Sequence, residues 1–261
     1  MLILETHAPR VIDTVVMDFD GTLSTLRCGW EQVMEPLMLE YIADAVPTAE
    51  QVAQVRDYID RSTGIQTILQ MKWLAERAAA KDPSAPADPW FYKAEYNRRL
   101  MLAVEKRRED AAAGNRQKYL VPGGEAFLRR MRAQGATLLA ASGTDECDVQ
   151  AEAKALGIDG YFAQIAGALP HSEDCSKEAT LRRLMAEGGK NVLVVGDGPV
   201  EIQLGRQFGA LTLGIASNER EPGGLEPAKL QRLKKAGAHA VVGTFADTEG
   251  IMSWMEGRSN G

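Results

Sequence analysis

Short apolar runs alternate with amphipathic stretches over most of the chain, and this pattern predicts a parallel α/β sheet. The apolar runs, each expected to be a strand, cover residues 11–17, 136–141, 161–166, 191–195, 211–215 and 240–242. Helical patterns lie between the later runs, at residues 125–134, 146–156, 177–187 and 200–208. A strand whose two faces are both covered by helices is apolar throughout, as these runs are. The pattern therefore predicts a Rossmann-like, three-layer α/β core.

The stretch between the first two expected strands has a different character, because it shows helical periodicity almost throughout. Helices are expected at residues 31–45, 51–60, 66–80 and 90–113. Thr48 and Gln51 have the spacing of a capping box at the start of the second helix, and three prolines within 81–89 end the third. We predict a helical cap domain at residues 26–118, inserted into a core domain made of residues 1–25 and 119–261.

Two acidic residues follow the first expected strand, in the sequence Asp18-Phe19-Asp20-Gly21-Thr22. Ligands of parallel α/β sheets bind at the carboxyl ends of the strands. Asp18 and Asp20 lie on the same side if the extended backbone continues to Asp20, and Gly21 permits a sharp turn. Two neighbouring carboxylates repel each other, so the pair indicates a bound cation, a shared proton or two different roles. A solvated turn is the alternative.

Three further polar groups follow the expected strands or begin a helix. Ser142-Gly143-Thr144 offers a hydroxyl and backbone N–H groups to a phosphate, although Ser142 could equally be a helix cap. Asp197 ends another apolar run, and Glu201 lies four residues later; this arrangement suits Mg²⁺, or a capping acid. Lys177 begins a helix, where its charge opposes the helix dipole, which indicates a nearby anion unless the side chain is simply solvated.

In this order and topology, these four motifs together resemble the haloacid dehalogenase (HAD) superfamily. The resemblance covers residues 10–23 and 119–245, and Asp18-Phe19-Asp20-Gly21-Thr22 is its most specific part. It implies a hydrolase, phosphatase-like, with a helical cap inserted after the first motif.

The resemblance also implies a role for each motif residue. Asp18 would be the nucleophile that forms an aspartyl-phosphate, and Asp20 the acid and base for the leaving group and the water. Ser142, Gly143 and Lys177 would bind the phosphoryl oxygens.

Mg²⁺ would be held by the carboxylates of Asp18 and Asp197 and by the backbone carbonyl of Asp20, and it would offset charge repulsion during attack. Many relatives carry Asp at the position of Glu201. The longer Glu201 is therefore expected to act through a water or to bond Lys177, and direct coordination stays open.

Asp20 favours phosphoryl chemistry on oxygen, because dehalogenases of the superfamily lack an acid two residues after the nucleophile. We predict a Mg²⁺-dependent phosphoric monoester hydrolase that acts on a small phosphorylated metabolite. The alternatives are a phosphomutase or a phosphonate-cleaving enzyme of the same superfamily, the latter using Lys72 or Lys93 as a Schiff-base amine. A phospho-accepting receiver and an inactive binding protein are alternatives from other classes.

Four residues of the hinge and cap are candidates for contact with the substrate. Arg27 could meet a second anionic group or form a surface salt bridge. Thr63, Gly64 and Gln66 interrupt two expected helices, in a segment that resembles the cap loop of related phosphatases; a plain interhelical turn is equally compatible.

Composition excludes several classes of protein. The net charge of −6 argues against a nucleic-acid-binding protein, which needs basic clusters to neutralise phosphates. Three widely spaced cysteines form no disulfide framework or zinc motif. No apolar run approaches the roughly 18 residues of a membrane span, and the first residues are too short for a signal segment. A cytoplasmic location is expected, and no oligomeric state is predicted.

Overall fold

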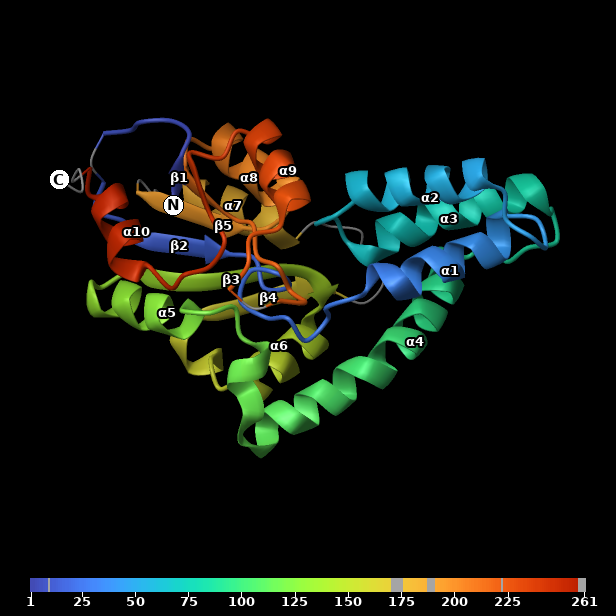
Figure 1. Ribbon diagram of the computed structural model, residues 1–261, viewed down its shortest axis with the longest axis horizontal. Helices are drawn as coiled ribbons and strands as arrows, with labels where there is room; N and C mark the ends of the chain where they lie inside the picture. The colour runs from blue at the N-terminus through green and yellow to red at the C-terminus, as the bar shows by residue number, and fades with distance from the viewer. Residues whose placement is uncertain (9, 170–175, 187–190, 222, 258–261) are drawn as a thin grey trace.

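The computed structural model describes residues 1–8, 10–169, 176–186, 191–221 and 223–257, and its centre is one seven-stranded sheet (Figure 1). The strands are β1 (Leu2–Ile3), β2 (Thr14–Met17), β3 (Thr137–Asp145), β4 (Gln164–Ala168), β5 (Val192–Gly196), β6 (Leu211–Ile215) and β7 (Ala240–Val242). Their order across the sheet is β1-β7-β6-β5-β2-β3-β4, and only β1 runs antiparallel to its neighbour. The predicted α/β fold with a mostly parallel sheet is confirmed.

The central strands are buried on both faces, which explains their continuous apolar sequences. Successive side chains of a strand point to opposite faces. Val15 and Met17 accordingly pack into one hydrophobic cluster, whereas Val16 between them packs into another with Leu181. Thr14 to Met17 pair in register with Thr137 to Ala140 on one side and with Val192 to Val195 on the other.

Helices cover both faces of the sheet, giving three layers (Figure 1). One face carries α5 (Gly124–Ala133), α6 (Glu146–Ala155) and α10 (Thr248–Met255), and the other carries α7 (Ser176–Ala186), α8 (Pro199–Gln207) and α9 (Pro227–Lys235). Because β2, β3 and β5 are neighbours, the residues that follow them meet at one edge of the sheet.

The segment between β2 and α5 forms a separate helical body beside this edge, drawn on the right in Figure 1. It contains α1 (Glu31–Ile42), α2 (Ala49–Arg61), α3 (Thr67–Lys81) and the long α4 (Pro89–Asp110), which returns the chain to the core. We call α1–α4 with their connections the cap. It has its own hydrophobic cluster, in which Met38, Met71 and Tyr92 are fully buried. The capping box between Thr48 and Gln51 is confirmed. The precise domain limits stay a prediction.

Some expected elements differ from those observed. The strand expected at 161–166 begins later, at Gln164, because Asp159–Tyr161 form a 3₁₀ turn before it. The helix expected to reach residue 113 ends at Asp110 and continues as a π-helical turn, Ala111–Asn115, and a 3₁₀ turn, Arg116–Tyr119. Residue 187 of the expected helix 177–187 lies outside the described residues. No described helix is both long and apolar enough to cross a membrane.

Candidate active site

Asp18 lies directly after β2 and is 6% exposed. One carboxylate oxygen, Oδ1, lies 2.8 Å from Nζ of Lys177 in the first turn of α7, and Oδ2 accepts a hydrogen bond of 3.2 Å from the Thr22 hydroxyl. The Lys177 amine also contacts Glu201 Oε2 on α8, at 3.0 Å. A single buried amine therefore joins the ends of three elements that are far apart in the sequence.

Burial and charge act against each other in this ion-pair cluster. Burial raises the pKa of Asp18 well above its usual range, and Lys177 offsets part of that rise. Burial alone would lower the pKa of Lys177, but Asp18 and Glu201 outweigh it and raise that pKa instead. Lys177 is thus positively charged, and the anion expected near it from its place at a helix start is the carboxylate of Asp18.

Asp20 lies on the turn after β2, and hydroxyl groups from the end of β3 hold its carboxylate. Oδ2 accepts hydrogen bonds from Thr144 Oγ1 at 2.8 Å and from Ser142 Oγ at 3.2 Å. Oδ1 lies 3.8 Å from Nε of Arg27. The Asp20 side chain is 25% exposed, in contrast to the buried Asp18. The two acids of the first motif therefore have different partners, as the sequence hypothesis of two roles requires.

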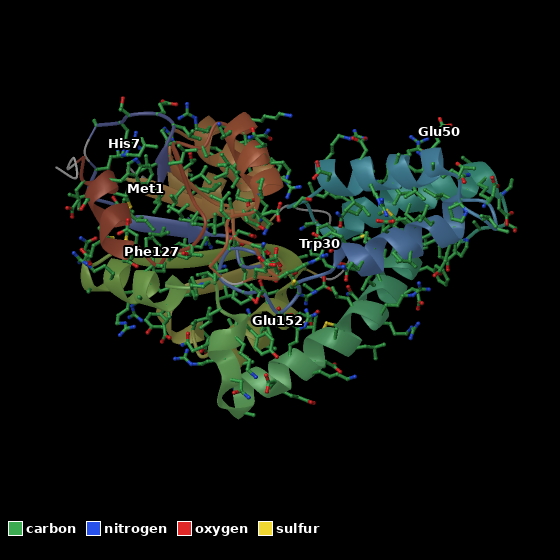
Figure 2. The ribbon with its side chains drawn as sticks, viewed as in Figure 1. Met1, His7, Trp30, Glu50, Phe127 and Glu152 are labelled. Carbon is green, nitrogen blue, oxygen red and sulfur yellow. The ribbon has the colours of Figure 1, made fainter. Side chains whose placement is uncertain are left out.

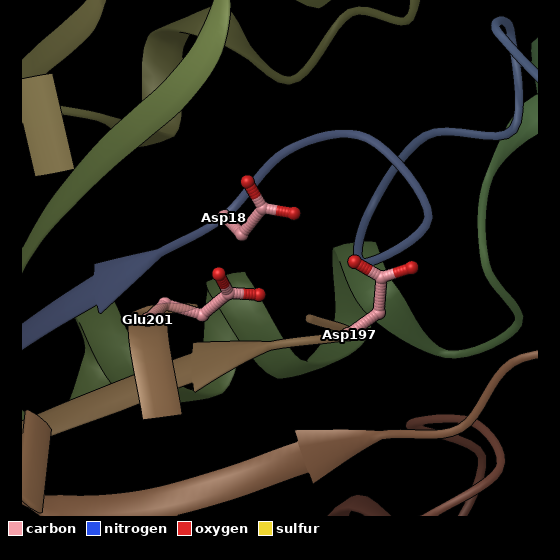
Figure 3. A group of neighbouring side chains, drawn as sticks. All are labelled: Asp18, Asp197 and Glu201. Atoms are coloured by element: carbon pink, nitrogen blue, oxygen red, sulfur yellow. The ribbon is translucent and has the colours of Figure 1, made fainter. Parts of the chain in front are cut away.

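Asp197 follows β5 and faces the turn after β2 (Figure 3). Gly21 makes this approach possible, since its φ is +72° and a Cβ there would lie 2.1 Å from Asp197 Oδ2. The same Oδ2 lies 2.6 Å from Nζ of Lys229 on α9, which in turn lies 2.6 Å from Glu219 Oε1. A buried lysine thus fixes one oxygen of Asp197.

The acidic cluster suits a hard divalent cation. Asp18, Asp197 and Glu201 each offer one carboxylate oxygen, and these three atoms lie within 4.8 Å of one another (Figure 3). Carboxylate oxygens are the ligands that Mg²⁺ prefers. Glu201, however, already accepts hydrogen bonds at both oxygens, from Lys177 and, at 2.6 Å, from the backbone N–H of Gly198. Asp18 likewise accepts at both oxygens, from Lys177 and Thr22, so hydrogen bonding does not separate Glu201 from Asp18 as a ligand.

Arg27 lines the cavity beside Asp20, but acidic side chains of α6 already bind its guanidinium. One of them, Glu152, is labelled in Figure 2. Nη2 lies 2.7 Å from Glu152 Oε1 and 3.4 Å from Asp148 Oδ2, and Nε also donates to Glu152. Glu152 is fully buried. Burial raises the pKa of Glu152 to about 7, although Arg27 opposes the shift. The salt bridge considered for Arg27 is therefore present, but it is buried rather than at the surface.

A cavity of about 100 Å³ separates these core residues from the cap. Thr63 and Gly64 line it, as expected, together with Ile65, Thr67, Gln70, Trp30 and Tyr96. The loop of residues 62–66 reaches the core directly, because the Gly64 carbonyl lies 3.4 Å from the Lys177 amine. A Cβ on Gly143 would lie 2.9 Å from the Ile65 carbonyl oxygen, so Gly143 provides the space for this loop.

Gln66 does not line this cavity, contrary to expectation. It is the residue before α3, is 2% exposed, and its Cα packs towards Gly143.

The two lysines considered for a Schiff base are also outside the cavity lining. Lys72 is exposed on α3, and Lys93 is buried in an ion pair with Asp145.

Residues 12–209 match the family model of haloacid dehalogenase-like hydrolases. The chain belongs to this family. A search of curated protein sequences finds no match. The HAD resemblance predicted from the sequence motifs is confirmed.

Solved structures of similar fold include hydrolases and a mutase. A predicted phosphatase from Clostridium acetobutylicum is 14% identical with a TM-score of 0.61, covering 93% of this chain and 99% of its own. A β-phosphoglucomutase from Clostridium difficile is 16% identical with a TM-score of 0.66, covering 94% and 97%. A phosphonoacetaldehyde hydrolase-like protein from Oleispira antarctica is 17% identical with a TM-score of 0.65, covering 98% and 96%. At these identities the likeness shows the shared fold of this HAD-like hydrolase.

Four contributors to the site were not predicted from the sequence. Lys229 and Glu219 follow β6, outside the four motifs, and Lys229 belongs to a lysine-rich helix that resembles a solvated surface. Glu152 is one charged residue within an ordinary amphipathic pattern. Thr144 was named only as part of the serine motif, although its hydroxyl makes the shorter bond to Asp20. The contact of buried Glu152 with Arg27 can be recognised only when the position of α6 is known.

Proposed function

We propose that this HAD-like hydrolase is a Mg²⁺-dependent phosphatase that acts on a small phosphorylated metabolite. The observation that carries the proposal is the contact of Asp18 with Lys177 at the carboxyl edge of the sheet, with Asp20 and Asp197 beside it. A buried carboxylate beside a fixed amine and a cation site suits attack on an anionic phosphate.

In the first half-reaction, an oxygen of Asp18 attacks phosphorus as the bond to the ester oxygen breaks. Asp20 gives its proton to the leaving alkoxide, so an alcohol departs and an aspartyl-phosphate remains. Lys177 offsets the charge on Asp18 and on the phosphoryl oxygens. Ser142 and the backbone of Gly143 lie at the end of β3, where they can donate to the same oxygens.

In the second half-reaction, Asp20 takes a proton from a water, which attacks phosphorus and releases phosphate and the Asp18 carboxylate. Thr144 holds the Asp20 carboxylate in position through both steps, which leaves the single Ser142 proton for a phosphoryl oxygen when substrate is bound. Mg²⁺, held by the Asp18 and Asp197 carboxylates and the Asp20 carbonyl, would neutralise charge on the phosphoryl group.

The two alternatives from the same superfamily receive less support. A phosphonate-cleaving mechanism through a Schiff base needs an amine beside the substrate, whereas Lys93 is buried against Asp145, Lys72 is exposed on α3, and neither lines the cavity. A phosphomutase must hold a substrate with two phosphoryl groups. The cap side chains that face the cavity are uncharged, which favours hydrolysis of a monoester.

The test is release of inorganic phosphate from p-nitrophenyl phosphate by the purified protein. We expect turnover that needs Mg²⁺, stops with EDTA and returns when Mg²⁺ is restored. A receiver or an inactive binding protein would not release phosphate catalytically. Absence of turnover from this ester and from a panel of phosphorylated metabolites would overturn the proposal.

A further inference from the structure

The wall that the cap presents to the cavity contains no charged side chain. All residues of the cap are described, and those from α1–α4 and their connections that line the cavity are Thr63, Gly64, Ile65, Thr67, Gln70 and Tyr96. Trp30, just before α1, completes this wall. Hydroxyl, amide and indole groups can bond a substrate hydroxyl, and aromatic rings pack against its carbon skeleton. None of these side chains can neutralise a carboxylate or a phosphate.

The cations that reach the cavity from the core are already paired. Lys177 lies between Asp18 and Glu201. Arg27 is held by Glu152 and Asp148 and lies near Asp20. Burial alone would lower the pKa of Arg27, but Glu152 and Asp20 outweigh it, so the guanidinium is charged and its charge is balanced within the protein.

The described residues that line the cavity offer no unpaired cation to a second anion. Among the described residues that line the cavity, four carry carboxyl groups (Asp18, Asp20, Asp197, Glu219) and two carry cationic groups (Arg27, Lys177). Both cations are already paired with acids, Arg27 with Glu152 and Lys177 with Asp18 and Glu201, so neither is left to neutralise a second anion. A second anionic group would have to be buried without a counterion, which is costly.

We propose that the leaving group of the substrate is a small neutral hydroxyl compound, such as a short polyol, and that esters whose alcohol carries a second anionic group are rejected. This inference rests on the proposed phosphatase function and names its substrate class. The second anionic group would be excluded where the cap contacts the leaving group, away from the atoms that take part in phosphoryl transfer.

The test compares glycerol 3-phosphate with 3-phosphoglycerate, which carries a carboxylate in place of a hydroxymethyl group, and uses p-nitrophenyl phosphate as the reference. We expect kcat/KM for glycerol 3-phosphate to exceed that for 3-phosphoglycerate by about tenfold or more. Equal values, a preference for the acid, or turnover of the reference ester alone would overturn the inference while leaving the phosphatase function standing. No turnover of any of the three esters would overturn the inference, and the panel of phosphorylated metabolites would then decide whether the phosphatase function stands.

A second test of the inference places a charge on the cap wall. Thr67→Lys puts an amine at the first residue of α3, on the lining, and should shift the ratio towards 3-phosphoglycerate by about tenfold. Val46→Lys is the matched control, because Val46 is 82% exposed between α1 and α2 and does not line the cavity. An unchanged ratio in a folded, active Thr67→Lys protein, or an equal shift in both variants, would contradict a charge-selective cap wall.

Discussion

The two walls of the cavity differ in chemistry. The core wall is a network of buried ion pairs, in which Lys177 and Lys229 join carboxylates from several strand ends. The cap wall is uncharged and reaches the core through backbone, with the Gly64 carbonyl near Lys177 and the Ile65 carbonyl over Gly143. The core wall has the groups needed to break a phosphate ester. The cap wall can only bind or exclude the alcohol part of that ester. Changes in the core wall should therefore reduce turnover, and changes in the cap wall should alter substrate binding.

The largest effect is expected at Asp18. Asp18→Asn keeps the size of the side chain but removes the nucleophilic carboxylate, so kcat/KM should fall by about 10³-fold or more. The fold should survive, because Lys177 keeps its contact with Glu201. Phosphate release and thermal unfolding measure the two effects separately. Asp13→Asn, at an exposed position just before β2, is the matched control. Wild-type phosphate release by Asp18→Asn would remove Asp18 from the chemistry.

A smaller effect is expected at Lys229, whose side chain touches Asp197 without lining the cavity. Burial alone would lower the pKa of Lys229, but Asp197 and Glu219 raise it, so Lys229→Met leaves two buried acids without their shared cation. Loss of the group that orients a metal ligand typically costs about 10- to 100-fold in metal affinity or activity. The Mg²⁺ dependence of turnover and Mn²⁺ binding followed by electron paramagnetic resonance would measure this loss.

Two further variants test whether Lys229 acts by its contact with Asp197 or only through the positive charge of the helix. Lys229→Arg retains a cation and should recover part of the metal binding. Lys234→Met removes an exposed lysine from the same helix and should have no effect. Metal binding that is the same in Lys229→Met as in the unchanged protein would show that Asp197 needs no support from α9.

The contact between the two walls can be altered at Gly143. Gly143→Ala places a methyl group 2.9 Å from the Ile65 carbonyl oxygen, so the cap loop must move outwards. We expect KM to rise by about fivefold, which corresponds to roughly 1 kcal/mol, with a smaller change in kcat. Gly160→Ala is the control, because an added Cβ there meets no atom within 4 Å. A fall in kcat with KM unchanged would place Gly143 with the chemical groups rather than with the cap contact.

The core wall was largely predictable from the sequence, and the reason is geometric. Parallel strands end at one edge, so polar residues that follow Met17, Ala141 and Val195 had to lie close together whatever the details of packing. Lys229 and Glu152 could not be found in this way. Each lies within a helix, where only the packing of that helix decides whether a charged side chain is solvated or buried against a partner.

The cap wall was less predictable, since a helical pattern gives the existence of a helix but not its rotation above a distant site. Thr63 and Gly64 line the cavity, and their contact with a substrate stays a prediction. Gln66, three residues from Thr63, instead lies against the core, and Gln70, one turn further on, lines the cavity. The core helices α9 and α10 were not predicted either, for a different reason: the sequence of α9 is rich in lysine, and α10 has only 8 residues.

The smallest effect on activity is expected at His239. A variant there tests whether the stability of the core can change without changing the activity of the core wall. His239 lies just before β7, at the amino end of that strand and so at the opposite edge of the sheet from Asp18. Burial, together with the charge of Arg206, lowers the pKa of His239 from 6.5 to about 4. The unfolded chain therefore binds a proton near pH 6.5 that the folded protein refuses until about pH 4, and stability falls as the pH drops through this window.

His239→Asn removes this titration while its side-chain oxygen can still accept the hydrogen bond that Nδ1 receives from the Thr212 backbone N–H. The loss of stability between pH 7 and pH 4.5, measured by urea unfolding, should be smaller in the variant by about 2 kcal/mol. Turnover at pH 7 should be unchanged, because His239 is neutral there and contacts neither wall. An equal pH dependence in both proteins would mean that other groups govern acid stability, and a loss of activity at pH 7 would mean that the two edges of the sheet are coupled.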